Sequence, residues 1–305
     1  MVLDRWLAVA LDRLAERPVC GYVAAHAPAA EPTSLAALAL IAHARLEAAQ
    51  TALGWLQQLQ AADGSVGVRA GEPRPGWPTA LAICAWQAAI DRATDDQAHA
   101  IGRDRLATAV KRGVEWLLAI EGVALKPTPA MGHDPSIVGW PWVASTHSWL
   151  EPTAWAVLAL RAAGQGDHLR TRDGLRLIED RLLATGGCNY GNTSVLGQVL
   201  RPHIQPTGLA LLALSGRATA IGKVARSCDY LTKTLDGSTA ALSLSYGLMG
   251  LAAQHRIPEQ LNDWLETACA RTLRQGKNLH ALALLSLAAA GDRGPLVLYR
   301  EGAPR

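Results

Sequence analysis

The residues best suited to chemistry gather in the segment 139–162, GWPWVASTHSWLEPTAWAVLALRA. Glu151 opens a helical pattern there, and His147 lies four residues before it. A carboxyl group among apolar side chains has a raised pKa and can act as a general acid, and an imidazole nearby can hydrogen-bond to it. A glutamate at a helix N-terminus is instead stabilised as the anion. Glu31 stands in an identical Glu-Pro-Thr context, which favours a capping role, so catalysis by Glu151 with His147 and capping both stay open.

Aromatic side chains accompany this candidate acid along the sequence. Tryptophan faces line apolar pockets and can stabilise a cation. We expect the substrate-binding residues to be Trp77, Trp140, Trp142, Trp149, Asn189, Tyr190 and Tyr246. Packing is the alternative, because tryptophans join helices as readily as they line ligand sites and a Gly-flanked asparagine often only shapes a turn.

Few features of the sequence favour binding of a metal ion or of a nucleic acid. His133, Asp134 and His147 do not have a known ligand spacing, and the five cysteines are scattered, odd in number and without a Cys-x-x-Cys pair. We therefore expect no metal, no cofactor and a reducing, cytoplasmic location. The net charge is only +3 and no basic stripe or nucleic-acid motif is present, so we expect no nucleic-acid partner.

A repeat organises the chain around these residues. Four segments open with Pro-Thr and continue almost entirely in Ala and Leu, and two later segments keep the apolar helix without Pro-Thr: 31–40, 77–86, 151–160, 205–214, 243–253 and 278–291. Proline is tolerated in the first helical turn, where its missing N–H would be unpaired anyway. A helix that is apolar all round is buried on every side.

Amphipathic helices with charged faces alternate with the apolar ones, at 45–60, 105–120, 173–184, 221–235 and 261–275. Buried helices that alternate with half-exposed ones indicate a double-layered ring. We therefore predict an all-α fold, a single (α/α)6 toroid of about six helical hairpins that spans residues 1–305. An open solenoid and an irregular helical domain are the alternatives.

Three loops carry a family resemblance. The segments 139–154 (GWPWVASTHSWLEPTA) and 186–192 (GGCNYGN) resemble those of the prenyltransferase and squalene oxidase repeat family, with Cys188 where its pattern has Trp. The turn 58–68 (QLQAADGSVGV) is similar to the Gln…Gly-x-Trp turns of squalene cyclases, with Val66 in the place of Trp. The resemblance implies a toroid with an isoprenoid or other apolar molecule in its central cavity.

Two branches of that superfamily differ in what they imply here. Protein prenyltransferase β subunits hold zinc with an Asp-x-Cys, but Ala241 and Ser243 stand at those positions, so zinc-dependent prenyl transfer is not expected. Class II terpene cyclases carry Asp-x-Asp-Asp-Thr-Ala, whose middle Asp is the acid. The resemblance puts Glu151 at that position, with Trp149 and Pro152 replacing the other two aspartates.

These observations predict a metal-independent, terpene cyclase-like protein. If it is an enzyme, protonation-initiated cyclisation or isomerisation is expected. One alternative is a non-catalytic toroid that binds lipid or serves as a protein-interaction scaffold, and another is a carbohydrate-active toroid, which needs paired carboxylates. Class II cyclases usually enclose their cavity between two domains, so a partner chain or peripheral membrane contact is also considered, and the oligomeric state stays open.

Overall fold

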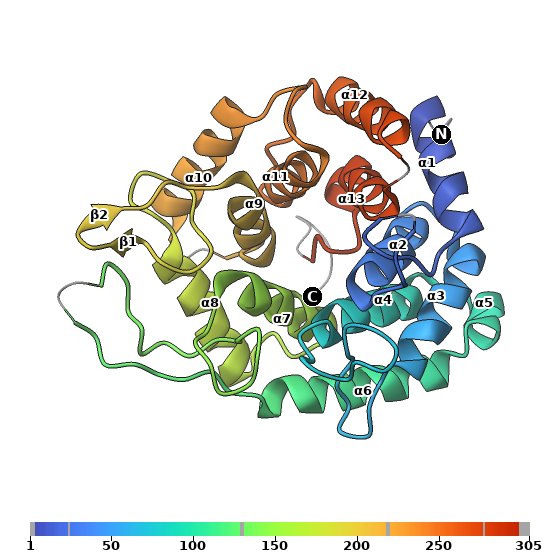
Figure 1. The fold of residues 1–305 in the computed structure, drawn as a ribbon, viewed down its shortest axis with the longest axis horizontal. Coiled ribbons are helices and arrows are strands. Elements are labelled where there is room, and N and C mark those ends of the chain that lie inside the picture. Colours follow the sequence, from blue (N-terminus) through green and yellow to red (C-terminus); the bar gives the residue numbers. More distant parts are fainter. Residues whose placement is uncertain (1–3, 24, 129–130, 218–219, 277, 299–305) are drawn as a thin grey trace.

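The computed structural model describes residues 4–298 apart from 24, 129–130, 218–219 and 277. The described chain is helical except for its loops and one short antiparallel hairpin, formed by β1 (Ser194–Val195) and β2 (Gln198–Val199) (Figure 1). The prediction of an all-α fold is therefore confirmed. Within this part of the chain, no helix combines the length and the apolar character that a membrane crossing requires.

An inner layer of six apolar helices can be traced in the described residues: α2 (Ala30–Ala42), α4 (Thr79–Arg92), α7 (Leu150–Ala162), α9 (Ile204–Ala213), α11 (Ala241–Ala253) and α13 (Leu279–Ala289). Each contacts the next one in this order, and α13 contacts α2, so the contacts close into a circle (Figure 1). Their side chains are buried almost throughout. Small residues allow this close packing: a Cβ on Gly250 of α11 would lie 2.5 Å from the carbonyl oxygen of Gly208 in α9.

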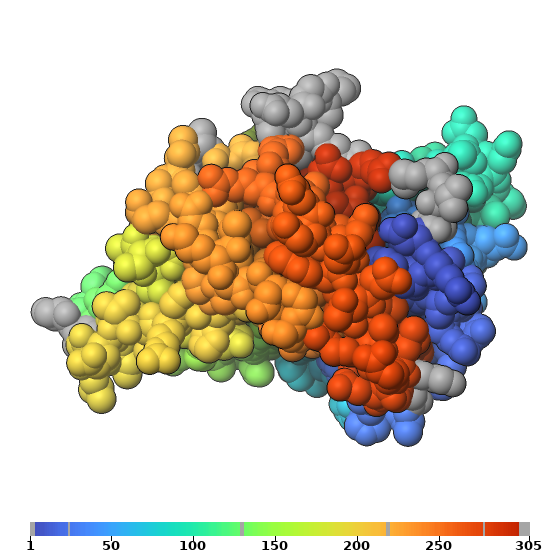
Figure 2. Space-filling model, turned by 90° about the horizontal axis from the view of Figure 1, so that it is seen from above, coloured from blue at the N-terminus to red at the C-terminus, as the bar shows by residue number. Residues whose placement is uncertain are grey.

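The outer layer consists of the amphipathic helices α1 (Arg5–Glu16), α3 (Leu46–Gln58), α6 (Arg103–Ala119), α8 (Leu169–Arg181), α10 (Ile221–Thr234) and α12 (Leu261–Arg274). Five of them pack on the inner helix that precedes them in the chain, while α1 packs on α13. Figure 2 shows this closure from the side, with the dark-blue N-terminal helix beside the orange-red last helices. The short helices α5 (Asp95–Ala100) and η1 (Gly291–Arg293) complete the fold.

The threonine of each Pro-Thr start fastens its helix to the preceding loop. In every case a backbone N–H of the loop donates to the threonine hydroxyl over 2.7 to 3.2 Å, in the pairs Cys20–Thr33, Val66–Thr79, Trp140–Thr153 and Cys188–Thr207. The separation along the chain is 13 residues in three pairs and 19 in the fourth, which holds the β1–β2 hairpin. Val66 and Cys188 thus stand in the place of Trp140 in their repeats.

Glycine is required in two of these loops. Gly64 and Gly186 adopt φ values of +93° and +98°, which favour glycine. A Cβ there would lie 2.3 Å from the carbonyl oxygen of Arg112 in α6 or of Arg226 in α10. The loop backbone therefore touches the following outer helix directly, which holds the loops over the ends of the inner helices.

Candidate functional site

Polar side chains meet at the N-terminal ends of the inner helices. The second residue of α2, α7, α9 and α13 is Glu31, Glu151, Gln205 and His280, respectively. Gln205 Nε2 donates a hydrogen bond to Glu151 Oε1 over 3.5 Å, and His280 Nε2 lies 3.7 Å from Glu31 Oε1. Together with two nearby tyrosines they form what we call the inner polar cluster: Tyr22, Glu31, Glu151, Gln205, Tyr246 and His280.

Glu31 has the least exposed carboxyl side chain among the ion pairs and close contacts of the described residues. Its side chain is 14% exposed. The Tyr22 hydroxyl donates to its Oε2 over 2.6 Å. Tyr22 reaches it because the Cys20–Thr33 bond fastens the loop two residues earlier. Burial raises the pKa of Glu31, while the hydrogen bond from Tyr22 acts in the opposite direction.

His280 cannot compensate the charge of Glu31 at neutral pH. Its side chain is 8% exposed, and burial lowers its pKa to about 4. The 3.7 Å contact with Glu31 therefore joins a neutral imidazole to a carboxyl group rather than forming an ion pair. The rings of Tyr22 and His280 meet edge to face with centroids 5.3 Å apart, which fixes the imidazole in place.

Glu151 has the titration behaviour of a general acid. Burial and, after it, the negative charge of Glu31 raise its pKa to about 7, while the hydrogen bond from Gln205 acts in the opposite direction. About half of this carboxyl is therefore protonated at neutral pH. Two carboxyl groups from different helices of the ring interact here, and paired carboxyls are what the carbohydrate-active alternative requires.

An aromatic pair adjoins the two carboxyls. The rings of Trp155 and Tyr246 are 6.4 Å apart in an edge-to-face arrangement, and both side chains are buried. The charges of Glu31 and Glu151 raise the pKa of the Tyr246 phenol, after burial itself. Among the described residues, the Trp155 indole N–H, the Tyr246 hydroxyl and His280 Nε2 have no hydrogen-bond partner. Such atoms are uncommon in folded proteins, because a buried donor or acceptor without a partner costs free energy.

The predicted partnership of His147 with Glu151 is not formed. His147 is exposed, and no hydrogen bond between these two side chains occurs in the described part of the chain. His147 and Trp149 instead line a surface pocket of about 330 Å³. The reason is that Trp149 precedes α7 in extended conformation, so His147 lies outside the helix turn that carries Glu151. Gln205 and Glu31 are the groups that influence the candidate acid.

The other predicted aromatic residues pack within the loops and against the outer helices. The Trp140 indole donates to the Leu117 carbonyl over 2.8 Å, and the Arg170 guanidinium covers its ring at 4.4 Å, so it packs between outer helices. Trp77 and Trp142 meet edge to face at 5.0 Å. Trp142 also lines a pocket of about 570 Å³ with Trp116. The contacts of Trp140 and Trp77 agree with the packing alternative, and the pocket beside Trp142 agrees with ligand binding.

Asn189 and Tyr190 shape the turn before the hairpin. The Asn189 amide donates to the Arg201 carbonyl over 2.9 Å, and its side-chain oxygen accepts from the Tyr190 N–H over 2.7 Å. The rings of Tyr190 and His203 pack together, and Tyr190 is 42% exposed. Of the predicted aromatic residues, Tyr246 alone contributes to the inner polar cluster described above.

Sequence reasoning missed five residues near the acid: Tyr22, Glu31, Trp155, Gln205 and His280. A signal existed for three of them, because Glu31, Gln205 and His280 stand where Glu151 stands in their own repeats. The repeated Glu-Pro-Thr leaves both catalysis and capping open in the sequence. The carboxylates of Glu31 and Glu151 instead accept from the side chains of Tyr22 and Gln205.

No group of three or more His, Cys, Asp or Glu side chains within the described residues is placed to hold a metal ion. The five cysteines are buried free thiols. Comparison of the chain with models of known protein families and with curated proteins found no match. The resemblance to the prenyltransferase and squalene oxidase repeat family therefore stands on the loop motifs and on the repeat.

Proposed function

We propose that this protein is a terpene cyclase-like enzyme that starts the cyclisation or isomerisation of an apolar, isoprenoid-type substrate by protonating it from Glu151. One observation carries the proposal. A buried carboxyl with a pKa of about 7 lies beside a second buried carboxyl, Glu31, and near the aromatic pair of Trp155 and Tyr246. A group that is half protonated at the working pH is well matched to general acid catalysis.

The strength of this acid favours a particular substrate. A carboxyl with a pKa near 7 is a weak proton donor, so an epoxide oxygen is a better acceptor than a plain alkene. In that step the Glu151 O–H bond breaks and the proton moves to the epoxide oxygen. The C–O bond opens with its electron pair on that oxygen, and the π electrons of a neighbouring alkene form the new C–C bond to the carbon left behind.

The cluster also has groups for the later steps. The faces of Trp155 and Tyr246 stabilise positive charge on the ring carbons. The Gln205 amide donates to the Glu151 carboxylate that remains after proton transfer. Loss of a proton from the carbon next to the final cation forms an alkene and returns the proton to Glu151, so the reaction is an isomerisation without net change in atoms.

The carboxyl pair supports a second candidate, glycoside hydrolysis. Glycosidases use one protonated and one ionised carboxyl on either side of the bond that is cleaved. Glu31 and Glu151 are both buried, and the charge of Glu31 raises the pKa of Glu151, which is the feature that favours this candidate. The buried aromatic surroundings and the loop motifs favour the apolar substrate.

The first prediction concerns turnover. The purified protein is incubated with squalene, epoxysqualene or geranylgeranyl diphosphate, and products are identified by mass spectrometry. We expect cyclised product from the epoxide at a rate that declines as the pH rises through about 7, because the protonated carboxyl is the active form. Glu151→Gln should lower this rate at least about 100-fold, which is the usual contribution of a general acid.

The exposed Glu115 on α6 offers a matched control, and Glu115→Gln should keep full activity. Denaturant unfolding of each variant separates loss of activity from loss of fold. Undiminished cyclisation by a folded Glu151→Gln protein contradicts the proposal. Release of nitrophenol from nitrophenyl glycosides would favour the second candidate. Tight capture of lipid or protein without any turnover would favour a scaffold.

A further inference from the structure

A pocket of about 330 Å³ lies between the loop segments 121–128 and 131–149 and the β1–β2 hairpin, which project from the same side of the ring in Figure 1. None of its lining residues belongs to the inner polar cluster. Its apolar walls come from Val123, Leu125, Met131, Ile137, Trp149 and Val195. This size is at the lower end for small-molecule sites, and mostly apolar walls with a few polar groups are typical of them.

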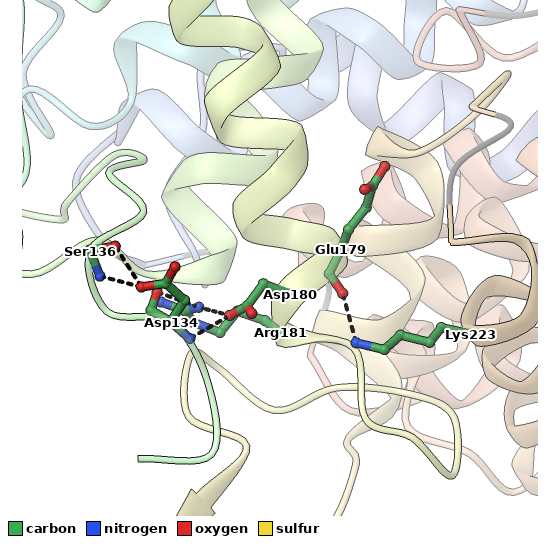
Figure 3. Close-up of polar contacts among 6 residues, drawn as sticks. All are labelled: Asp134, Ser136, Glu179, Asp180, Arg181 and Lys223. Atoms are coloured by element: carbon green, nitrogen blue, oxygen red, sulfur yellow. Dashed lines mark hydrogen bonds and ion pairs between the residues drawn. The ribbon is translucent and has the colours of Figure 1, made fainter. Parts of the chain in front are cut away.

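Two residues that line the pocket each hold a buried polar atom without a partner. The Arg181 side chain is 4% exposed; its guanidinium pairs with Asp180 and donates to the Asp134 carbonyl over 3.3 Å (Figure 3). Among the described residues, Arg181 Nε and His133 Nδ1 have no hydrogen-bond partner. Both residues line the pocket. Buried polar atoms cost free energy until a partner satisfies them, so both favour a ligand that brings an oxygen atom.

The charges around these atoms favour a neutral ligand. Asp180 balances Arg181. The Asp134 carboxylate accepts from the Ser136 N–H and O–H over 2.9 and 2.6 Å, which lowers the pKa of Asp134 and keeps it negative (Figure 3). Burial and then the Arg181 charge lower the pKa of His133, so its imidazole is neutral at pH 7. The charges of Arg181, Asp180 and Asp134 therefore add up to one negative charge, which repels anions.

We propose that this pocket binds a neutral, mostly apolar molecule of about ten carbons that carries one carbonyl or hydroxyl oxygen. The oxygen accepts hydrogen bonds from Arg181 Nε–H and His133, and the apolar walls enclose the carbon skeleton. Trp149 and His147, which the sequence marks as site residues, contribute to this second site. The site is independent of the acid chemistry proposed for Glu151.

The test uses a ligand pair that differs in one oxygen atom. The full chain is titrated with 4-tert-butylcyclohexanone and with tert-butylcyclohexane, and binding is followed by calorimetry. We expect the ketone to bind at least about tenfold more tightly, since one satisfied hydrogen bond to a buried group is worth about that factor. The effect should be seen with the wild type at pH 7.

Two substitutions locate the binding. His133→Leu should remove the preference for the ketone, and Val195→Trp should abolish binding of both ligands by filling the pocket from the exposed hairpin, where it does not endanger the fold. His99→Leu, on the exposed face of α5, should change nothing. Glu151→Gln should also leave ketone binding unchanged, which separates this inference from the proposed enzyme.

Three outcomes overturn the inference. The first is equal affinity for the two ligands in the wild type. The second is ketone binding that persists in a folded Val195→Trp protein. The third is tighter binding of decanoate than of the ketone, because a site with one excess negative charge should reject a carboxylate.

Discussion

At the scale of single residues, shared burial determines the behaviour of Glu31 and Glu151. Each follows a loop and precedes Pro-Thr, yet neither acts as an isolated cap, because the ring brings them into one site. Burial raises both pKa values, and the charge of one opposes ionisation of the other. His280 stays neutral and cannot offset either charge.

The pH dependence of stability follows from the raised pKa of Glu151. In the unfolded chain its pKa is near the ordinary value of 4.5, and in the folded chain it is about 7. The folded state thus holds the proton more tightly, and the resulting stabilisation is complete below pH 4.5 and is lost as the pH rises through 7. The difference corresponds to about 3 kcal/mol.

We therefore expect Glu151→Gln to gain stability relative to the wild type as the pH increases from 4.5 to 8, by up to about 3 kcal/mol. Denaturant unfolding at several pH values measures this difference directly. Glu115→Gln, at an exposed position, should follow the wild type within about 0.5 kcal/mol. A pH-independent difference for Glu151→Gln would show that this carboxyl ionises freely in the folded protein.

At the scale of the elements, buried threonine hydroxyls connect each loop to its inner helix. The same bond recurs in four repeats and tolerates the six additional residues of the fourth loop, since the hairpin projects outward from it. The loops matter for the site, because one of them presents Tyr22 to Glu31 and another carries the walls of the surface pocket.

Thr153→Val tests this connection. Valine has nearly the same shape, but it leaves the buried Trp140 N–H without the acceptor that it now reaches over 2.9 Å. We expect a loss of about 1–3 kcal/mol in the free energy of unfolding. Thr108→Val is the matched control, since the Thr108 hydroxyl lies on the exposed face of α6 and donates only to the Asp104 carbonyl in its own helix. Its cost should stay within about 0.5 kcal/mol, and similar costs for both variants would contradict the role of the threonine.

At the scale of the whole molecule, the first helix and the last inner helix pair with each other. The helix α1 contacts both α12 and α13, so the N-terminal helix is an internal member of the ring rather than a free end (Figure 2). In an open array of repeats, a terminal helix has only one neighbour and unfolds locally. A ring removes that weak end and joins all hairpins into one cooperative unit.

Because the ring is closed, we expect substitutions at two distant positions to lower the free energy of unfolding by the same amount. Leu11 of α1 and Leu231 of α10 are both fully buried. Leu11→Ala and Leu231→Ala should each lower the free energy of unfolding by about 2–4 kcal/mol in a single transition. Circular dichroism and fluorescence, followed through denaturation, would give coincident curves. A loss below about 1 kcal/mol for Leu11→Ala, or a separate early transition, would show that α1 frays independently.

The sequence alone determined the helices and their two layers. The uncharged, mostly apolar run 152–160 marks a helix buried on all sides, and the structure has it within α7. The charged face of 261–275 marks a half-exposed helix, which is α12. These inferences succeed because helical periodicity and proline geometry are local, so neighbouring residues contain the information.

Only the tertiary structure decided which residues share a site. Trp140 is close to Glu151 along the chain, yet its indole bonds to Leu117 and packs between outer helices. Glu31 and His280 stand near opposite ends of the chain, yet they touch because α13 closes the ring against α2. Burial and neighbouring charge set the pKa of Glu151, and both are properties of its surroundings in space, which ring closure creates.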